Sequence, residues 1–167
     1  MATTFECEGP FNIGVRKEAG GRSLKAAAGE LKNFWASNGL GSRVGCYVFG
    51  FRRSGGSYMP WYVGKATKSF AQECFQSHKL VKYGIALNKN RKGTPFLLLL
   101  CHKKGRGKTN GKAINALELD LINEAFQVNE NVTNERKIRK PKYVLRGLND
   151  PGGPSSALKA YKQMMGY

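Results

Sequence analysis

The chain has 167 residues and carries 28 Lys and Arg against 11 Asp and Glu, which gives a formal net charge of +17. Its hydrophobic fraction of 41% is typical of one globular domain, and its longest apolar run, residues 95–101, is far too short to cross a bilayer. A membrane-spanning protein is therefore excluded, and because no basic segment followed by an apolar one opens the chain, we expect a cytoplasmic protein.

The first part of the chain predicts an extended segment, a helix and a β-hairpin. Their expected bounds are residues 5–15 for the extended segment, 23–37 for the helix, and 44–53 and 61–65 for the hairpin strands, with a turn at 54–57. The extended segment is broken at Gly9-Pro10. The helix counts Leu24 among its apolar positions and closes near Gly39.

The second part of the chain predicts a helix, a buried central strand, a basic loop and a second long helix. Ser69 is the expected cap of the first of these helices, with Gln72 completing a capping box, and helical character extends past His78 towards residue 88. The later elements are a strand at 96–101, a loop at 103–111, a helix at 112–127, a strand at 142–148 and a short C-terminal helix.

The helix expected at residues 112–127 places an acid among apolar side chains. At about 100° per residue, Glu118 falls inside the apolar arc that includes Ile114 and Leu121. A carboxylate in that position needs a cation or several donors to replace its solvation. Two interpretations stay open, a structural ion pair and a metal-binding or catalytic role. The same projection places His78 on the apolar face of its own helix, which favours a core histidine.

Two local patterns resemble functional sites, but we interpret each of them differently. The segment HKKGRGKT, residues 102–109, follows a strand and precedes a helix as a phosphate-binding P-loop does, but His102 stands where that motif needs its first glycine. We therefore interpret it as a phosphate-contacting basic loop. The four cysteines form no CxxC pair, so we expect reduced, buried thiols rather than a zinc site or a disulfide scaffold.

Basic residues are concentrated in one stretch. Ten Lys and Arg and no acid lie in residues 79–112, whereas residues 113–130 have four acids and no base. Such a stretch is either a solvated face or a surface that binds nucleic acid by releasing counterions, and the size of the net charge favours nucleic acid. The expected nucleic-acid contacts are Lys68, Lys79, Lys82, Lys103, Lys104, Arg106 and Lys108.

Four pieces of sequence, in a fixed order, resemble the GIY-YIG nuclease superfamily. They are Gly45-Cys46-Tyr47, Tyr62-Val63-Gly64-Lys65, a helix with His78, and Glu118 in ALELDLI. The resemblance covers residues 45–134 and implies an α+β fold, with a small, mostly antiparallel central sheet of about three strands flanked by helices and the 45–65 hairpin at its centre. The implied division, within one globular unit, is an N-terminal extension (1–43, a strand plus a helix packed on the core), a core (44–134) and a basic C-terminal extension (135–167).

The resemblance implies metal-dependent hydrolysis of phosphodiester bonds in nucleic acid, with DNA favoured over RNA and no small-molecule cofactor. Tyr47 would bind the attacking water and help to deprotonate it, which requires Lys65 and a bound metal to lower a phenol pKa that is ordinarily about 10. Tyr62 would hold the phosphate or the water network. Glu118 would bind one Mg²⁺ or Mn²⁺.

Two further residues are implied by the same resemblance. His78 becomes an auxiliary acid or a phosphate contact rather than a core histidine. An asparagine follows the glutamate by about a dozen residues in this family, and Asn131 is the nearest match, with Asn134 as the alternative.

One departure from the family bears on activity. The first helix of the family carries an arginine that clamps the scissile phosphate, and the matching position here holds Glu73 or Cys74. Either Lys65, Lys68 or Lys79 replaces that clamp, or the domain binds without cutting. The alternative function is therefore a catalytically inactive nucleic-acid-binding module.

Overall fold

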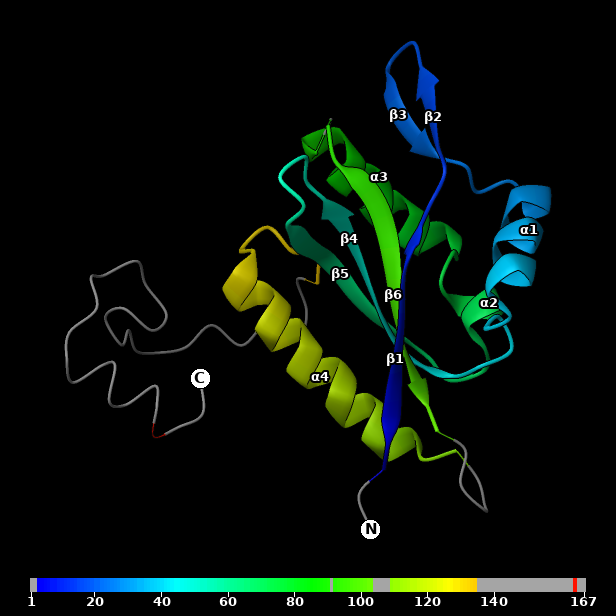
Figure 1. Cartoon of the computed structure of the whole chain (residues 1–167), viewed down its shortest axis with the longest axis vertical. Helices are drawn as coiled ribbons and strands as arrows, with labels where there is room; N and C mark the ends of the chain where they lie inside the picture. Colours follow the sequence, from blue (N-terminus) through cyan, green and yellow to red (C-terminus); the bar gives the residue numbers. More distant parts are fainter. Residues whose placement is uncertain (1–2, 91, 104–108, 135–163, 165–167) are drawn as a thin grey trace.

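The computed structural model describes residues 3–90, 92–103, 109–134 and 164 of the chain. It is an α+β protein in which helices flank an antiparallel sheet (Figure 1). In chain order its elements are β1 (Phe5–Asn12), β2 (Val15–Glu18), β3 (Gly21–Leu24), α1 (Ala28–Asn38), β4 (Gly45–Arg52), β5 (Tyr58–Ala66), α2 (Phe70–Glu73), α3 (Ser77–Lys89), β6 (Thr94–His102) and α4 (Gly111–Val128). The strand and helix expected after residue 135 lie outside the described residues. No helix in the described part is both long and apolar enough to span a membrane.

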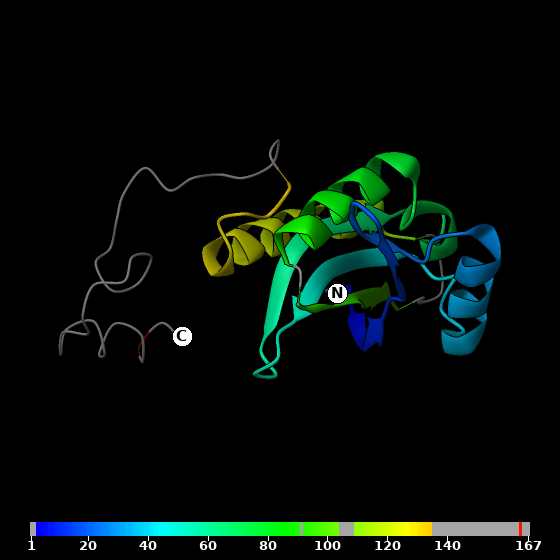
Figure 2. The ribbon, with the colours of Figure 1, turned by 90° about the horizontal axis from the view of Figure 1, so that it is seen from above.

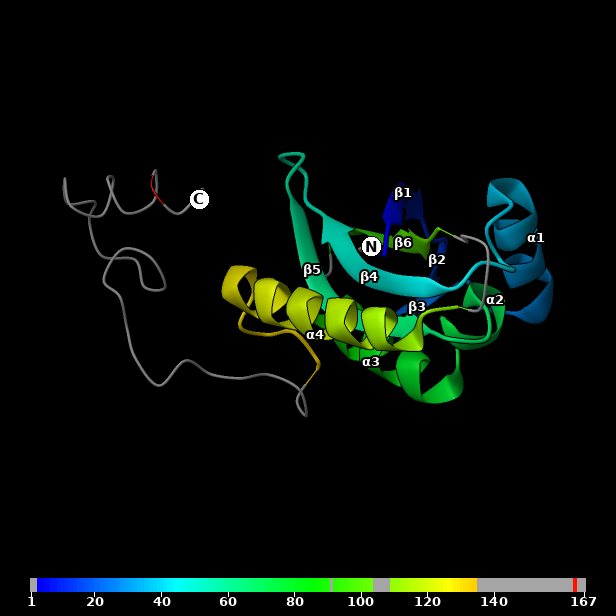
Figure 3. The ribbon, with the colours of Figure 1, turned by 90° about the horizontal axis from the view of Figure 1, so that it is seen from below.

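The main sheet has four strands in the order β1-β6-β4-β5, and each neighbouring pair is antiparallel. The internal position of β6 was predicted from its continuous apolar run. The N-terminal strand β1 also joins this sheet, so the sheet has one strand more than the expected three. The hairpin is not wholly central, because β4 is internal whereas β5 is an edge strand. Figures 2 and 3 show that both α3 and α4 lie on the side of the molecule away from β1.

The segment before α1 is a second, two-stranded sheet that the sequence pattern did not predict. β2 and β3 project beyond the main sheet as a small hairpin (Figure 1). The helix expected from residue 23 therefore begins later, at Ala28, and Leu24 belongs to β3. The periodicity was misleading because Leu24 and Leu31 both pack against the core, although they belong to different elements. The helix ends as expected, at Gly39, whose φ of 68° is left-handed.

The single helix expected from Ser69 towards residue 88 is two helices, α2 and α3. The predicted cap is confirmed, since Ser69 Oγ accepts a hydrogen bond from the Gln72 N–H at 3.2 Å. After one turn the chain leaves the helix, and Gln76, with an extended backbone (φ −62°, ψ 149°), is the N-cap residue of α3. The break changes the helical phase. His78 is consequently exposed and Lys79 is buried, so the expectation of an apolar setting for His78 is wrong.

Two side chains of α3 explain the break. The Tyr83 hydroxyl donates a hydrogen bond to the Cys74 carbonyl at 2.8 Å, and Lys79 Nζ donates to the Glu73 carbonyl at 2.6 Å. In a continuous helix these carbonyls would accept the N–H groups four residues further on. Because the side chains satisfy both acceptors, the interruption leaves neither carbonyl unpaired.

Close packing explains the glycine in each of the two tyrosine motifs. Tyr47 is paired with Gly64 across β4 and β5, and a Cβ at Gly64 would overlap the Tyr47 ring and hydroxyl. Gly45 has a φ of 148°, and a Cβ there would overlap the Leu100 carbonyl. The glycine of the second motif therefore makes room for the phenol of the first.

The two faces of β4 have different partners. Tyr47 and Phe49 point to the face covered by α3, where Phe49 stacks on Tyr83 with ring centroids 4.1 Å apart. Cys46 points to the opposite face, and its Sγ donates to a backbone carbonyl of α4 at 3.3 Å. The cysteines are free thiols, and three are buried as expected, but Cys7 is exposed.

Candidate functional site

The structure brings Tyr47 and Tyr62 together on neighbouring strands, with ring centroids 6.3 Å apart. Tyr47, on the internal strand β4, is 0% exposed, and its hydroxyl makes no hydrogen bond of regular geometry with a described residue. Tyr62, on the edge strand β5, is half-buried. Tyr62 is therefore the phenol that solvent can reach.

Burial raises the pKa of Tyr47 well above its ordinary value of 10.0, and the nearby Tyr83, Cys74 and Tyr62 raise it further. Lys65 does not lower this pKa in the free protein, and the lowering expected from Lys65 together with a bound metal stays a prediction. Since burial disfavours the phenolate, the Tyr47 side chain stays protonated at neutral pH and does not act as a base in this state.

The hydroxyl of Tyr62 responds to the charge on α4. Burial is the main reason that its pKa rises from 10.0 to about 12, and the carboxylate of Glu118 is the second. An electrostatic effect of this kind weakens with distance, so Tyr62 and Glu118 belong to one cluster.

Glu118 forms an ion pair with a lysine of the second tyrosine motif. Its side chain on α4 is buried, and its Oε2 lies 3.3 Å from Lys65 Nζ. The same ammonium donates a hydrogen bond to Asn115 Oδ1 at 2.6 Å. Of the two interpretations left open by the sequence, the structural ion pair is present. Because the Lys65 side chain is 32% exposed, the pair lies at the surface end of the cluster rather than in the core.

Lys79 places a second ammonium beside the phenols. It is only 6% exposed, and its Nζ lies 5.3 Å from the centroid of the Tyr47 ring. Burial lowers its pKa below the usual 10.5, and the nearby Cys74, Glu73 and Glu118 oppose that lowering. A desolvated cation in such a position gains from an anionic partner.

Glu73 occupies one of the two positions expected to hold an arginine. Its carboxylate accepts hydrogen bonds from the backbone N–H groups of Thr67 and Lys68, each at 2.6 Å, and so fixes the turn before α2. The Lys79 ammonium contacts the carbonyl of the same residue. Positive charge is therefore present at this position, but it comes from α3.

His78 and Asn131 were expected at the site, but neither belongs to the cluster. His78 is exposed in the first turn of α3, away from the buried side of that helix. Asn131 is exposed as well. The alternative, Asn134, is held against β5, where its side chain accepts from the Val63 N–H at 2.8 Å and donates to the Val63 carbonyl at 2.7 Å. Asn134 is therefore the asparagine that lies next to Tyr62 in the fold.

The remaining basic residues have separate positions. Lys68 is exposed, and Lys82 Nζ donates to the Thr133 carbonyl at 2.6 Å. Lys103 lies 3.2 Å from Glu6 and, through a hydrogen bond, is the main cause of the lowered pKa of that carboxyl. Three predicted contacts, Lys104, Arg106 and Lys108, lie outside the described residues.

Two residues of the cluster were missed by the sequence analysis. Asn115 precedes Glu118 by three positions, and Tyr83 follows Lys79 by four, so each shares a helix face with a residue that was singled out. Helical spacing could have found both. What the sequence did not show is the break before α3, which turns Lys79 and Tyr83 inward.

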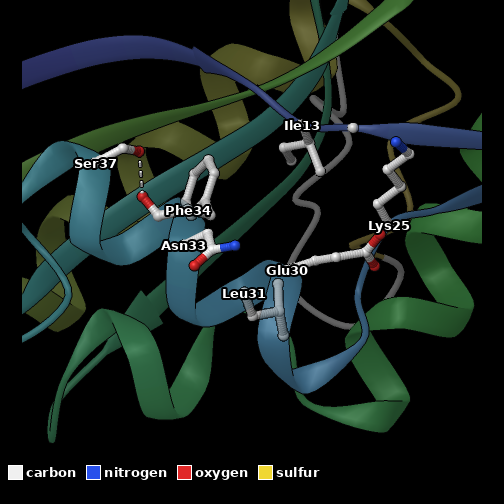
Figure 4. Close-up of a pocket in the computed structure, with 8 residues that line it drawn as sticks. Ile13, Lys25, Glu30, Leu31, Asn33, Phe34 and Ser37 are labelled. Carbon is white, nitrogen blue, oxygen red and sulfur yellow. Dashed lines mark hydrogen bonds between the residues drawn. The ribbon is translucent and has the colours of Figure 1, made fainter.

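A hollow of about 420 Å³ lies away from this cluster, beside α1, and none of the predicted site residues lines it. Figure 4 shows Ile13, Leu31 and Phe34 among the side chains that line it. Glu30 at the hollow is already paired with Arg16, whose Nη2 lies 2.8 Å from the carboxylate. The hollow therefore adds nothing to the chemistry of the cluster.

The cluster suits only a metal that needs few protein ligands. Within the residues described, no three His, Cys, Asp or Glu side chains are grouped closely enough to hold an ion. Mg²⁺ keeps several waters and takes ligands from substrate phosphates, so one carboxylate is enough to anchor it. Glu118, with the amide oxygen of Asn115 nearby, fits that limited requirement.

The chain has no match among protein-family models, curated proteins or solved structures. The resemblance to GIY-YIG nucleases therefore stays a prediction from the motifs.

Proposed function

We propose that the protein is a nucleic-acid-processing enzyme that hydrolyses phosphodiester bonds with the help of a divalent cation. The observation that carries this proposal is the convergence of Tyr62, Lys65 and Glu118 at the edge strand of the sheet. The net charge of +17 favours a polyanionic substrate. The GIY-YIG resemblance favours DNA over RNA.

Glu118 is the residue that would hold Mg²⁺ or Mn²⁺. A bound cation supplies Lewis-acid stabilisation of the charge that develops on the phosphate. With its carboxylate holding the cation in exchange for the ion pair, Glu118 would leave Lys65 available to bind a phosphate oxygen. The partial exposure of Lys65 supports this exchange, because the ammonium can turn towards solvent without crossing the core.

The phenols and the buried lysine would position the phosphate. Tyr62 is half-buried and protonated at neutral pH, so its hydroxyl can donate a hydrogen bond to a phosphate oxygen or to the attacking water. Tyr47 lies behind it as a buried donor. Lys79 takes the place of the missing arginine, because an arriving phosphate gives its desolvated ammonium the anionic partner that favours the charged form.

Cleavage assays on Glu118→Gln test the proposal, with Glu124→Gln as the matched control on the exposed side of the same helix. We expect the wild type to nick supercoiled DNA only with Mg²⁺ or Mn²⁺, and the Glu118 variant to lose at least about 100-fold in rate. The control should keep nearly full activity. Cleavage that survives Glu118→Gln would overturn the assignment of this acid.

A catalytically inactive binding module is the second candidate, and Glu73 is the observation that favours it. Its carboxylate fixes the turn at a position where an arginine was expected, and a negative group there opposes phosphate binding. This function predicts salt-sensitive binding of nucleic acid with no cleavage in either metal. Failure to bind DNA or RNA even at low salt would reject both candidates.

A further inference from the structure

A row of side chains crosses the end of the main sheet that lies farthest from Tyr47 on β4. Arg52 is paired with Tyr58 of β5 on one side and with Thr94 of β6 on the other. Directly paired residues of antiparallel strands point to the same face, so these three side chains lie next to one another. Together with Lys92 they line a hollow of about 280 Å³.

The hollow is strongly basic. Arg52, Arg53 and Lys92 line it, and its described lining residues include no acid. Arg53 Nη2 contacts Met59 Sδ at 3.0 Å, and among the described residues no ion pair involves any of the three cations. Three like charges around one small hollow repel each other, and a bound anion removes that repulsion.

Tyr58 adds an exposed aromatic ring to these cations. It is 50% exposed, yet its ring is fixed by an edge-to-face contact with Phe96, at 5.2 Å between centroids and 86° between planes. An exposed ring beside guanidinium groups is the combination with which proteins hold a nucleotide, since the base packs on the ring and the phosphate binds the cations. Exposure and anchoring together indicate a contact surface rather than a core position.

We infer that this hollow is a second nucleic-acid contact, which holds a phosphodiester group of the substrate strand away from the cleavage cluster. Its volume of about 280 Å³ is below the range of about 300–1,000 Å³ usual for small-molecule sites, so it suits one phosphate with its waters. The inference takes its partner, nucleic acid, from the proposed function, but it does not depend on hydrolysis.

The spacing along β4 fits one continuous strand of nucleic acid. Lys65 of the cluster is paired with Cys46, and Arg52 follows Cys46 by six positions on the same face of β4, which at about 3.3 Å per residue spans about 20 Å. Successive base pairs rise about 3.4 Å, so the hollow would hold a phosphate about six nucleotides from the one at the cluster.

Equilibrium binding measures this interaction independently of catalysis. The test variant is Arg52→Gln with Lys92→Gln, and the control, Lys17→Gln with Lys32→Gln, removes the same charge from exposed positions on β2 and α1. Affinity for labelled duplex DNA, single-stranded DNA and single-stranded RNA is measured by fluorescence anisotropy in EDTA over a range of salt. We expect the test variant to bind at least one of them about tenfold more weakly than the control does. The slope of log affinity against log salt should become shallower by about 0.7–0.9 for each phosphate that the variant no longer neutralises.

The three nucleic acids and a third variant identify the bound strand. If it is single-stranded, Tyr58→Ala weakens binding of that strand by about fivefold or more, because no ring remains for a base to stack on. If the two double variants bind all three nucleic acids equally well, the inference is overturned, since only the total charge then matters. A protein that fails to cut in any metal but shows the expected difference in binding contradicts the proposed hydrolysis and leaves this second binding site in place.

Discussion

Among individual side chains, Glu118 connects several members of the cluster. It pairs with Lys65, raises the pKa of Tyr62 and opposes the lowering of the pKa of Lys79. The carboxylate thus favours the protonated form of Tyr62 and Lys79, although burial has the larger effect on each. Removing its charge while keeping its shape should therefore be visible in the titration of a neighbouring phenol.

Glu118→Gln should lower the pKa of Tyr62 from about 12 towards 10.0, because the carboxylate is the second cause of the increase. The pKa should remain above 10.0, since burial, the main cause, is unchanged. Phenolate absorbance near 295 nm or ¹³C NMR of labelled tyrosine measures the shift, and Tyr62→Phe assigns the signal. Glu124→Gln should leave the pKa of Tyr62 unchanged. If Glu118→Gln also leaves it unchanged, Tyr62 and Glu118 are too far apart for the proposed site.

The raised pKa of Tyr62 also determines the direction in which stability changes with pH. The folded-state pKa of Tyr62 lies above the unfolded value, so the folded chain holds a proton that the unfolded chain loses above pH 10. The stabilisation is fully present below pH 10 and is lost as the pH rises to about 12. A smaller shift in Glu118→Gln makes this alkaline loss smaller.

At the level of the elements, Asn134 connects the segment after α4 to the edge of the sheet. Its amide pairs with both backbone groups of Val63, which is how a neighbouring strand would satisfy an edge strand. This contact fixes β5 between Tyr62 and Gly64. It also explains why an asparagine is useful here even if it never touches a substrate.

Asn134→Ala should destabilise the fold by about 1–3 kcal/mol, because it leaves a backbone donor and acceptor without their partners. Asn131→Ala is the matched control, since that side chain is exposed, and it should change stability by less than about 0.5 kcal/mol. Urea unfolding followed by circular dichroism measures both. Equal, small losses would show that the amide contact with Val63 adds little to the stability of β5.

Elements with a strong local signal were predicted from the sequence. The apolar run of β6, the cap at Ser69 and the periodicity of α4 depend on residues close together in the chain. The break between α2 and α3 could not be found in this way, because Tyr83 and Lys79 satisfy the freed carbonyls from the next helix. No residue of β2 or β3 is fully buried, so the β2–β3 hairpin has no fully buried face to reveal it.

Only part of the candidate site was predicted, because only part of it depends on residues close together in the chain. The buried setting of Glu118 followed from its position on one helix, and the proximity of the two tyrosines followed from the hairpin. The exposure of His78 and the choice of Asn134 over Asn131 depend on how chain segments turn after a helix begins or ends. Periodicity within a helix does not contain that information.

Considered as a whole, the chain combines a large positive charge with a small sheet. A net charge of +17 makes the folded state repel itself, and added salt screens that repulsion. Salt also weakens the binding of nucleic acid, because counterions are no longer released as favourably. Added salt therefore stabilises the free protein but removes the stabilisation that bound nucleic acid provides, and both effects change the melting temperature.

The melting temperature should therefore depend on salt in opposite ways with and without DNA. The free protein should become more stable as salt rises, since the screening length falls from about 10 Å at 0.1 M to about 3 Å at 1 M. Duplex DNA at about 100 times its dissociation constant adds about 2.7 kcal/mol at low salt. If about four phosphates are neutralised, affinity falls about 100-fold between 50 and 200 mM salt, and most of this stabilisation disappears. Differential scanning fluorimetry over a salt series should show the two curves converging, whereas parallel curves would mean that the charge of this protein serves a partner other than nucleic acid.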